Sequence, residues 1–299
     1  MTDWTAADLP SFAGRTVIIT GANSGLGAVT ARELARTGAA VIMAVRTPSK
    51  GEAAARQIAG DIEVRQLDLQ DLSSVRRFAD GVEKVDILIN NAGIMASPYA
   101  VTVDGFESQI GTNHLGHFAL TGLLLDRLLA TDGARVVNVA SGAHRFGSIR
   151  FDDLQWKNGY RKWRAYGQSK LANLLFTLEL QRKADAAGKK LLCVACHSGY
   201  AATNLQAVGP KMSGSSMMES LTELGNRLFA QSAAMGALPT EYAAVAPDVH
   251  GGDYYGPDGM AELWGNPTKV GRSTAAQDNA AAARLWEVSE RLTNVHYQF

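Results

Sequence analysis

The stretch Thr20-Gly21-Ala22-Asn23-Ser24-Gly25-Leu26-Gly27 decides the fold, because it joins an apolar run, Val17 to Thr20, to a segment with helical periodicity. Its glycines permit a tight turn, close approach of the backbone to a ligand, and close helix packing. The free N–H groups and the dipole of a helix N-terminus favour negative charge. A strand, a glycine turn and a helix in this order therefore predict a site for the diphosphate of a dinucleotide.

Short apolar runs alternate with amphipathic segments along the rest of the chain. The runs expected to form buried strands are 17–20, 40–45, 64–67, 87–90, 136–139 and 191–196. The expected helices include 28–37, 171–187 and 280–292. This alternation predicts right-handed crossovers and an α/β fold with a parallel sheet covered on both faces.

Composition excludes some classes of protein. The chain has 299 residues, and its 29 basic residues balance its 29 acidic ones, so no global charge attracts nucleic acid or an anionic membrane. The first residues carry no apolar run typical of a secretory signal. The longest apolar stretch, 120–130, is interrupted by Asp126 and Arg127 and is too short to span a membrane. We expect a soluble protein located in the cytoplasm.

Two cysteines, Cys193 and Cys196, have the CxxC spacing of redox pairs and metal sites. They lie in an apolar run with the composition of a strand, where residues three apart point to opposite faces. The prediction is two buried structural thiols and no disulfide.

The end of the second expected strand bears on the choice of cofactor. An NAD site usually places an acidic residue there for the ribose 2′-hydroxyl, but Ala44-Val45-Arg46 has none. The guanidinium of Arg46 suits a 2′-phosphate, and Lys50 follows on the next turn. The pattern favours NADP(H) over NAD, and the alternative is that Arg46 is an ordinary surface arginine.

Two further motifs, Asn90-Asn91-Ala92-Gly93 and Tyr166-Gly167-Gln168-Ser169-Lys170, follow the glycine turn in order. With that turn they resemble the short-chain dehydrogenase/reductase family, over about Arg15 to Tyr255. The sequences of residues 111–118 and 137–141 are similar to those of the retinol-dehydrogenase-type branch. The resemblance implies one domain over 1–299: a Rossmann-type doubly wound parallel sheet with helices on both faces, and a substrate lid at about 205–240.

Four residues are expected to catalyse hydride transfer between nicotinamide and a carbonyl or alcohol carbon. Tyr166 is the general acid/base. Lys170 lies one helical turn later on the same face, and its charge, with that of the oxidised nicotinamide, would lower the pKa of Tyr166. Ser141 would hold the substrate oxygen. The resemblance implies that Asn113 anchors a water that relays protons to the lysine, and that Lys170 binds the nicotinamide ribose.

The expected cofactor-binding residues extend from the glycine turn to the end of the sixth strand. They are Gly21, Asn23, Ser24, Gly25, Leu26, Gly27, Arg46, Asp68, Leu69, Asn90, Ala92, Gly93, Tyr166, Lys170, Gly199 and Thr203. Asp68 matches the family residue at the adenine. Asn90 and Gly93 match the turn over the adenosine side. The chain departs from the family's Pro-Gly pattern at Ser198, which restores an N–H donor and puts the backbone path beside the nicotinamide in doubt.

The substrate is the least determined feature. In the expected lid, Met217, Leu221, Leu224 and Leu228 form a stripe that suits a pocket for a lipophilic alcohol, aldehyde or ketone, or that packs on the lid's own core. A basic and aromatic cluster precedes Tyr166; it is a solvated edge or a site for an anionic group of the substrate, and we expect no nucleic-acid binding. This cluster consists of Trp156, Tyr160, Arg161, Lys162, Trp163 and Arg164.

Metal binding is not expected, because His114, His117 and His144 have no carboxylate or cysteine partner at ligand spacing. Two alternatives to a carbonyl reductase or alcohol dehydrogenase stay open. One is an NADP-dependent C=C reductase, and the other is a non-catalytic NADP-binding redox sensor, against which the intact Tyr166 and Lys170 count. A homo-oligomer would bury Leu171, Leu174, Leu175 and Leu178, although some of these must face their own sheet.

Overall fold

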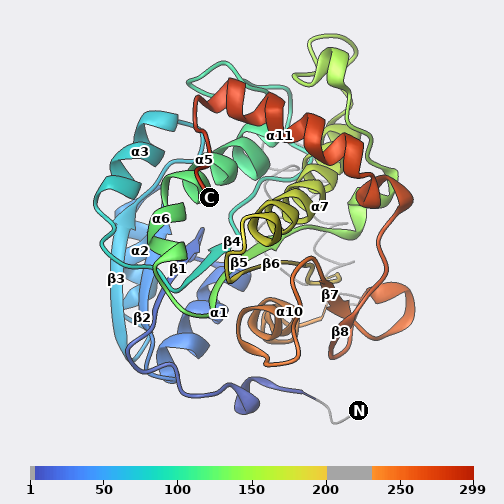
Figure 1. The fold of residues 1–299 in the computed structure, drawn as a ribbon. Helices are drawn as coiled ribbons and strands as arrows, with labels where there is room; N and C mark the ends of the chain where they lie inside the picture. The colour runs from blue at the N-terminus through green and yellow to red at the C-terminus, as the bar shows by residue number, and fades with distance from the viewer. Residues whose placement is uncertain (1–3, 201–230) are drawn as a thin grey trace, which may run out of the picture.

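The computed structural model describes residues 4–200 and 231–299, which form an α/β unit around one sheet (Figure 1). Its strands are β1 (Thr16–Thr20), β2 (Ala40–Val45), β3 (Asp61–Gln66), β4 (Ile87–Asn90), β5 (Ala134–Val139), β6 (Leu191–Cys196), β7 (Tyr254–Pro257) and β8 (Pro267–Lys269). Their order is β3-β2-β1-β4-β5-β6-β7-β8, and every pairing is parallel except that of β7 with β8. The predicted doubly wound parallel sheet is confirmed.

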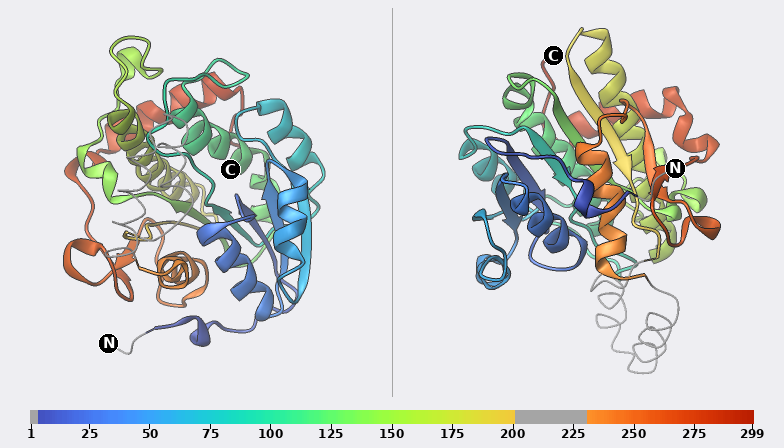
Figure 2. Two further views of the ribbon diagram at one scale, coloured as in Figure 1. Left: turned by 180° about the vertical axis from the view of Figure 1, so that it is seen from behind. Right: turned by 90° about the horizontal axis from the view of Figure 1, so that it is seen from below.

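Helices cover both faces of the sheet. They are α1 (Gly25–Arg36), α2 (Pro48–Ala55), α3 (Leu72–Asp80), α4 (Ser108–Ile110), α5 (Gly116–Leu123), α6 (Leu125–Leu129), α7 (Lys162–Ala186), α10 (Ala233–Val245) and α11 (Asn279–Thr293). Helices α1 and α10 lie on one side of the sheet, and α5 and α7 lie on the other (Figures 1 and 2). Short 3-10 turns are η1 (Ala6–Asp8), η3 (Gly142–Phe146), η4 (Phe151–Asp153), η5 (Met260–Glu262) and η6 (Thr274–Gln277), and η2 (Gly111–Leu115) is a π-helix.

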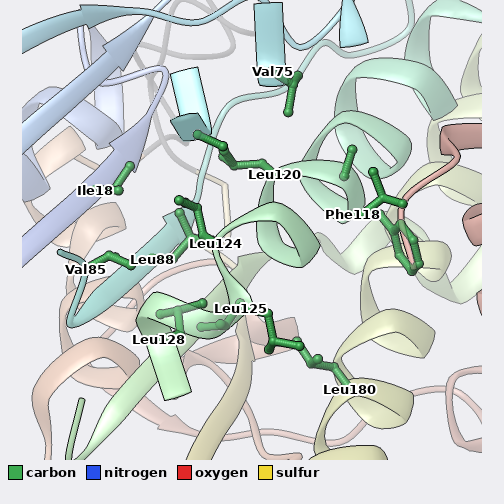
Figure 3. Packing of buried hydrophobic residues seen from close by; sticks show 14 of the residues in the cluster. Ile18, Val75, Val85, Leu88, Phe118, Leu120, Leu124, Leu125, Leu128 and Leu180 are labelled. Carbon is green, nitrogen blue, oxygen red and sulfur yellow. The ribbon is translucent and has the colours of Figure 1, made fainter. Parts of the chain in front are cut away.

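The alternation of side chains along each strand divides the apolar core into two layers. Ile18 joins the cluster under α3, α5 and α7, whereas Val17 and Ile19 join the cluster under α1 and α10. Figure 3 shows the first cluster, in which Leu88 of β4 lies close to Leu124. Cys193 and Cys196 are free and buried and belong to opposite clusters, so the prediction of two structural thiols is confirmed.

Helix α11 lies over α7 and α5 as an outer layer (Figure 1). Leu285 and Ala282 of this helix pack in one cluster with Leu171, Leu174 and Leu175 of α7. These three leucines are buried inside the chain. The described structure therefore gives them an intramolecular partner, and a homo-oligomer built on them stays a prediction.

The observed elements extend beyond some of the expected ranges. Strand β3 begins at Asp61, before the expected range. Its first residues alternate between exposed and half-buried, so they do not form the apolar run on which the expectation was based. Helix α7 begins at Lys162, before the expected range. Its first residues, 162–164, are exposed and include two charged side chains, so they do not continue the apolar pattern of the later turns. Of the range expected for the lid, residues 205–230 lie outside the described residues. Residues 233–240 belong to α10, which packs against α1.

The order of strands defines where a ligand binds. The chain runs outward from β1 through β2 to β3 and then returns to β4 on the other side of β1. In open α/β sheets, ligands bind at such a reversal, beyond the carboxyl ends of the strands. The glycine turn, the Asn91–Gly93 turn, Ser141 and Gly199 all follow the carboxyl ends of these strands. Within residues 4–200 and 231–299, no helix is both long and apolar enough to cross a membrane.

Two buried histidines predict how stability depends on pH. Burial lowers the pKa of His114 to about 3 and that of His117 to about 4, whereas an unfolded histidine titrates near 6.5. Since the folded state keeps His114 neutral, its contribution to stability is complete above pH 6.5 and is lost as the pH falls toward the folded pKa. We expect His114 to account for a loss of about 2 kcal/mol in the free energy of unfolding between pH 6.5 and pH 5.

Denaturant unfolding at the two pH values, with His114→Gln beside the wild type, measures this contribution. The variant should lose less stability between pH 6.5 and pH 5 than the wild type does. His250→Gln is the matched control because the His250 side chain is 81% exposed, and its pH dependence should differ from that of the wild type by less than that of His114→Gln does. An equal pH dependence in His114→Gln would contradict the prediction.

Candidate functional site

The glycine turn after β1 forms a cradle that only glycine fits. Gly21 has a φ of +68°, which favours glycine. A Cβ on Gly27 would lie 2.6 Å from Asn91 Nδ2 and 2.8 Å from the Gly21 carbonyl oxygen. Ser24 is the N-cap of α1, and within the described chain its side chain makes no capping hydrogen bond. The first turn of α1 thus presents backbone N–H groups to an anion, as the diphosphate site requires.

The hydroxyl of Thr20 joins this cradle to two other segments. Its oxygen accepts hydrogen bonds from the backbone N–H groups of Asn91 and Ala92, both at 2.9 Å, and lies 2.8 Å from His117 Nε2. His117 Nδ1 lies 3.1 Å from the Asn113 carbonyl oxygen. Since a carbonyl only accepts, Nδ1 carries the proton and the neutral ring accepts the Thr20 hydroxyl at Nε2. The sequence does not predict Thr20 as part of the site, and for His117 it predicts only that the residue binds no metal.

Asn113 lies in the π-helix Gly111–Leu115, a rare backbone form that often marks functional sites. Its side-chain oxygen accepts from the Ile94 N–H at 2.8 Å, and its Nδ2 donates to the Ile94 carbonyl at 2.9 Å and to Ser169 Oγ at 2.9 Å. These bonds tie the segment after Gly93 to α7. A Cβ on Gly93 would lie 3.1 Å from Asn113 Oδ1 and 3.6 Å from Lys170 Nζ, so the backbone at Gly93 borders both residues.

Tyr166 and Lys170 lie on one face of α7 next to the end of β5. Lys170 Nζ donates to the Val139 carbonyl at 2.9 Å and lies 5.8 Å from the centre of the Tyr166 ring. Tyr166 is 5% and Lys170 3% exposed. Ser141 begins η3 two residues after Val139, and its hydroxyl accepts from the Ala143 N–H at 3.2 Å. The structure therefore brings Asn113, Ser141, Tyr166 and Lys170 together.

Burial dominates the titration of this group in the protein alone. It raises the pKa of Tyr166 to about 12, and a hydrogen bond with Ser141 acts in the lowering direction. Burial also lowers the pKa of Lys170 to about 8. The lowering of the Tyr166 pKa that we expect thus does not arise from the lysine by itself, and it would need the second positive charge, that of the oxidised nicotinamide.

The space between α1 and α2 opens beside the glycine turn, and none of Asp68, Asn90 and Gly93, the residues expected at the adenosine side, lines it. A groove of about 700 Å³ there is lined by Asn23 and Ser24 of the glycine turn, by Arg32 of α1 and by Lys50 of α2. Arg46, directly after β2, is exposed, and in the described part of the chain no carboxylate lies within ion-pair distance of Arg46 or Lys50. These cations are therefore available to a phosphate.

The residues that follow β3 and β4 differ in their burial and in the hydrogen bonds that they make within the chain. The Asp68 carboxylate accepts a hydrogen bond from the Gln70 N–H at 2.9 Å. Leu69 is buried, and its backbone lies so close to α5 that a Cβ on Gly116 would be 2.6 Å from the Leu69 carbonyl oxygen. Asn90 is buried, and its amide donates to Thr121 and Asn138 beneath the turn. Contact of these residues with a cofactor stays a prediction. The neighbouring Asn91, which was not predicted, donates to the Thr20 carbonyl at 2.7 Å.

The departure at Ser198 leaves the following turn well defined. Gly199 has a φ of +60°, and a Cβ there would lie 2.4 Å from the Leu263 carbonyl oxygen. Its N–H donates to His197 Nδ1 at 3.2 Å, and the Ser198 carbonyl accepts from Gln231 Nε2 at 2.7 Å. Thr203 lies outside the described residues. Within residues 4–200 and 231–299, no group of three or more histidine, cysteine or acidic side chains is placed to hold a metal ion.

Comparison with known proteins agrees with this geometry. The family model for short chain dehydrogenases matches residues 15–212. Human retinol dehydrogenase 13 is 44% identical over 94% of this chain and 85% of its own length. Mouse retinol dehydrogenase 12 is 42% identical over 95% of this chain and 88% of its own length. The chain belongs to the short-chain dehydrogenase/reductase family. Within that family it falls in the retinol-dehydrogenase-like branch.

Solved structures share the fold. A crystal structure of an uncharacterised protein from Mycobacterium paratuberculosis has a TM-score of 0.86 and 58% identity, with all of both chains covered. A protein from Beutenbergia cavernae, described as an NAD(P)-dependent gluconate 5-dehydrogenase with bound NADP, has a TM-score of 0.61 and 27% identity. That match covers 81% of this chain and 94% of the other.

The cradle at Gly27 leads to a direct prediction. In Gly27→Ala the new Cβ would overlap the Gly21 carbonyl and the Asn91 amide, and backbone cannot move aside cheaply. We expect affinity for NADPH to fall at least tenfold and the free energy of unfolding to fall by about 1–3 kcal/mol. Gly81→Ala is the control, because a Cβ there meets no atom closer than 3.6 Å. Fluorescence titration with NADPH makes the measurement, and unchanged affinity in Gly27→Ala would contradict the cradle.

Proposed function

We propose that the protein is an NADP-dependent oxidoreductase that transfers a hydride between nicotinamide and a carbonyl or alcohol carbon. The observation that carries the proposal is the convergence of Ser141, Tyr166 and Lys170 at the carboxyl end of β5, behind a glycine cradle suited to a diphosphate. Bound NADP(H) supplies or accepts the hydride.

Tyr166 is the general acid/base in this proposal. Its hydroxyl gives a proton to the substrate oxygen during carbonyl reduction and takes one from the alcohol during oxidation. Burial raises its pKa, so the tyrosine is protonated at neutral pH and ready to donate. Oxidation requires the tyrosinate, which the ammonium of Lys170, 5.8 Å from the ring, stabilises together with the charge of the oxidised cofactor.

The other groups hold the reacting atoms and resupply the proton. The Ser141 hydroxyl, which interacts with Tyr166, holds the substrate oxygen. The Lys170 ammonium has three N–H donors, and one of them bonds to the Val139 carbonyl. The other two are available to the nicotinamide ribose and to a water. Asn113 fixes the segment after Gly93 beside that ammonium through its side-chain bonds to Ile94, and in this proposal it anchors the relay water.

Two observations support a lipophilic substrate. Trp163 and Phe146 are 50% and 56% exposed, and both lie beside the catalytic segment of α7. The Trp163 ring lies 6.4 Å from the Tyr166 ring, and Phe146 packs against Gly167. Apolar surface next to the acid/base residue suits an aliphatic or polyene aldehyde, ketone or alcohol. The retinol dehydrogenases among its relatives make retinoids one class to test.

Exchange of Tyr166 for phenylalanine tests the catalytic part. Purified wild type and Tyr166→Phe are titrated with NADPH and then assayed by loss of nicotinamide absorbance over a panel of carbonyls that includes retinal. We expect kcat to fall at least a hundredfold in the variant while affinity for NADPH changes less than threefold, because only the proton donor is lost. Binding of NADPH without turnover of any carbonyl by the wild type would favour the redox-sensor alternative.

Exchange of Arg46 for alanine tests the choice of cofactor. If the guanidinium binds the 2′-phosphate, its loss should weaken NADPH binding about 10- to 100-fold, the value of one or two charge-assisted hydrogen bonds. NADH lacks this phosphate, so its affinity should change less than twofold. Arg291→Ala is the matched control, because Arg291 is an exposed arginine of α11 that does not line this groove. Equal losses for both nucleotides in Arg46→Ala would refute a role in discrimination.

Three further predictions from the sequence wait for experiment. Cell fractionation tests the proposed cytoplasmic location, and sedimentation velocity tests the homo-oligomer. Activity with anionic and neutral substrates in a charge-reversed Arg161 and Arg164 variant tests whether the exposed basic cluster before Tyr166 binds an anionic group.

A further inference from the structure

We propose that Glu262 is a positioning residue for hydride transfer: its carboxylate connects the segment that carries Ser141 to the turn that carries Gly199. These two segments follow β5 and β6, and they would lie on either side of the nicotinamide. The inference rests on the proposed function, and it concerns a residue about 120 positions from Ser141 in the sequence.

The connection to Ser141 runs through η3. Arg145 of η3 donates from Nη2 to Glu262 Oε1 at 2.8 Å and to the Gly271 carbonyl at 2.9 Å. His144, in the same turn, has Nδ1 2.7 Å from the Ser141 carbonyl oxygen, and its Nε2 accepts from the Ser273 N–H at 3.2 Å. The turn that begins with Ser141 is thus held against residues 262–273 at two successive side chains.

The connection to Gly199 runs through His197. Its Nδ1 accepts the Gly199 N–H at 3.2 Å, and its Nε2 lies 3.1 Å from Glu262 Oε2, a close polar contact whose angle is not that of a hydrogen bond. The two oxygens of one carboxylate therefore serve different segments, Oε1 the Arg145 side and Oε2 the His197 side. Of the three side chains, His197 is buried, while Glu262 and Arg145 are 24% and 46% exposed, so water reaches only the Arg145 side freely.

The surrounding packing places the carboxylate at this junction. Tyr254 lies between the two histidines, with its ring 5.6 Å from that of His144 and 5.1 Å from that of His197. The backbone of Glu262 has a φ of +59° and that of Ala261 a φ of +55°, a region disfavoured for residues with side chains. Leu263, the next residue, accepts the Tyr200 N–H at 2.8 Å through its carbonyl. Residues 261–263 thus adopt an unfavourable path that closes directly on the Gly199 turn.

The carboxylate does not touch the reacting atoms, so its loss should act through geometry. We expect Glu262→Ala to lower kcat at least tenfold, with less than a threefold change in the Kd of NADPH, because the diphosphate contacts expected at the glycine turn do not depend on this carboxylate. Glu262→Gln keeps one acceptor oxygen and should retain an intermediate kcat. Arg145→Ala should cause a smaller loss in the Glu262→Ala background than in the wild type, because its bond to Glu262 is already absent there and only its bond to the Gly271 carbonyl remains to be lost.

Hydrogen exchange supplies a readout that does not depend on turnover. Deuterium uptake should rise in residues 141–147 and 197–200 of Glu262→Ala and stay unchanged in β1 and β4. The control is Glu63→Gln, which removes an exposed carboxylate paired with Arg65 on β3 and should leave kcat and both segments as in the wild type.

Two results would overturn the inference. One is a Glu262→Ala variant with wild-type kcat and wild-type exchange. The other is a uniform rise in exchange with parallel losses in melting temperature, kcat and NADPH affinity, which would indicate a purely structural role. If the wild type turns over no carbonyl, the proposed function fails by itself, and the exchange pattern still decides whether Glu262 fixes the two segments.

Discussion

One buried hydroxyl group, that of Thr20, joins three of the segments that form the candidate site. It ends β1, accepts two backbone hydrogen bonds from the turn after β4, and meets His117 of α5. This junction, together with the Asn91 bond to the Thr20 carbonyl and the Asn113 bonds to Ile94, fixes the relative positions of the glycine cradle, the Gly93 turn and the π-helix. Its location at the reversal of strand order explains why residues distant in sequence meet there. A neutral His117 suits this role, because its ring must accept from Thr20 and donate to Asn113 at the same time.

The second constraint is the burial of ionisable groups next to that junction. Burial makes Tyr166 a weaker acid and Lys170 a weaker base, with pKa values of about 12 and 8. The same low-dielectric surroundings strengthen the electrostatic interaction of these two groups with any charge on a bound cofactor. The protein alone thus keeps the proton on Tyr166, which suits the general acid proposed for carbonyl reduction.

The sequence predicted the sheet because six of its strands are apolar runs bounded by turn residues. Strands β7 and β8 were not predicted, since Tyr254–Pro257 and Pro267–Lys269 are short and contain glycine or proline. The expected catalytic residues were identified by a match to family motifs, and the structure brings them together. The roles of Thr20, His117 and Glu262 could not be predicted, because each depends on contacts between segments far apart in the chain. The spacing of His117 four residues after Asn113 was the one available signal, since such residues share a helix face.

The most direct test of hydride transfer to a carbonyl carbon follows the hydrogen itself. Wild-type protein is incubated with NADPH deuterated at the transferable C4 position and with a carbonyl substrate from the panel, and the product is analysed by NMR and mass spectrometry. We predict one deuterium on the new carbinol carbon, and at least a hundredfold less labelled product from Tyr166→Phe in the same time. Deuterium on the β-carbon of a saturated product whose carbonyl is intact would identify a C=C reductase, and a product without deuterium would contradict hydride transfer.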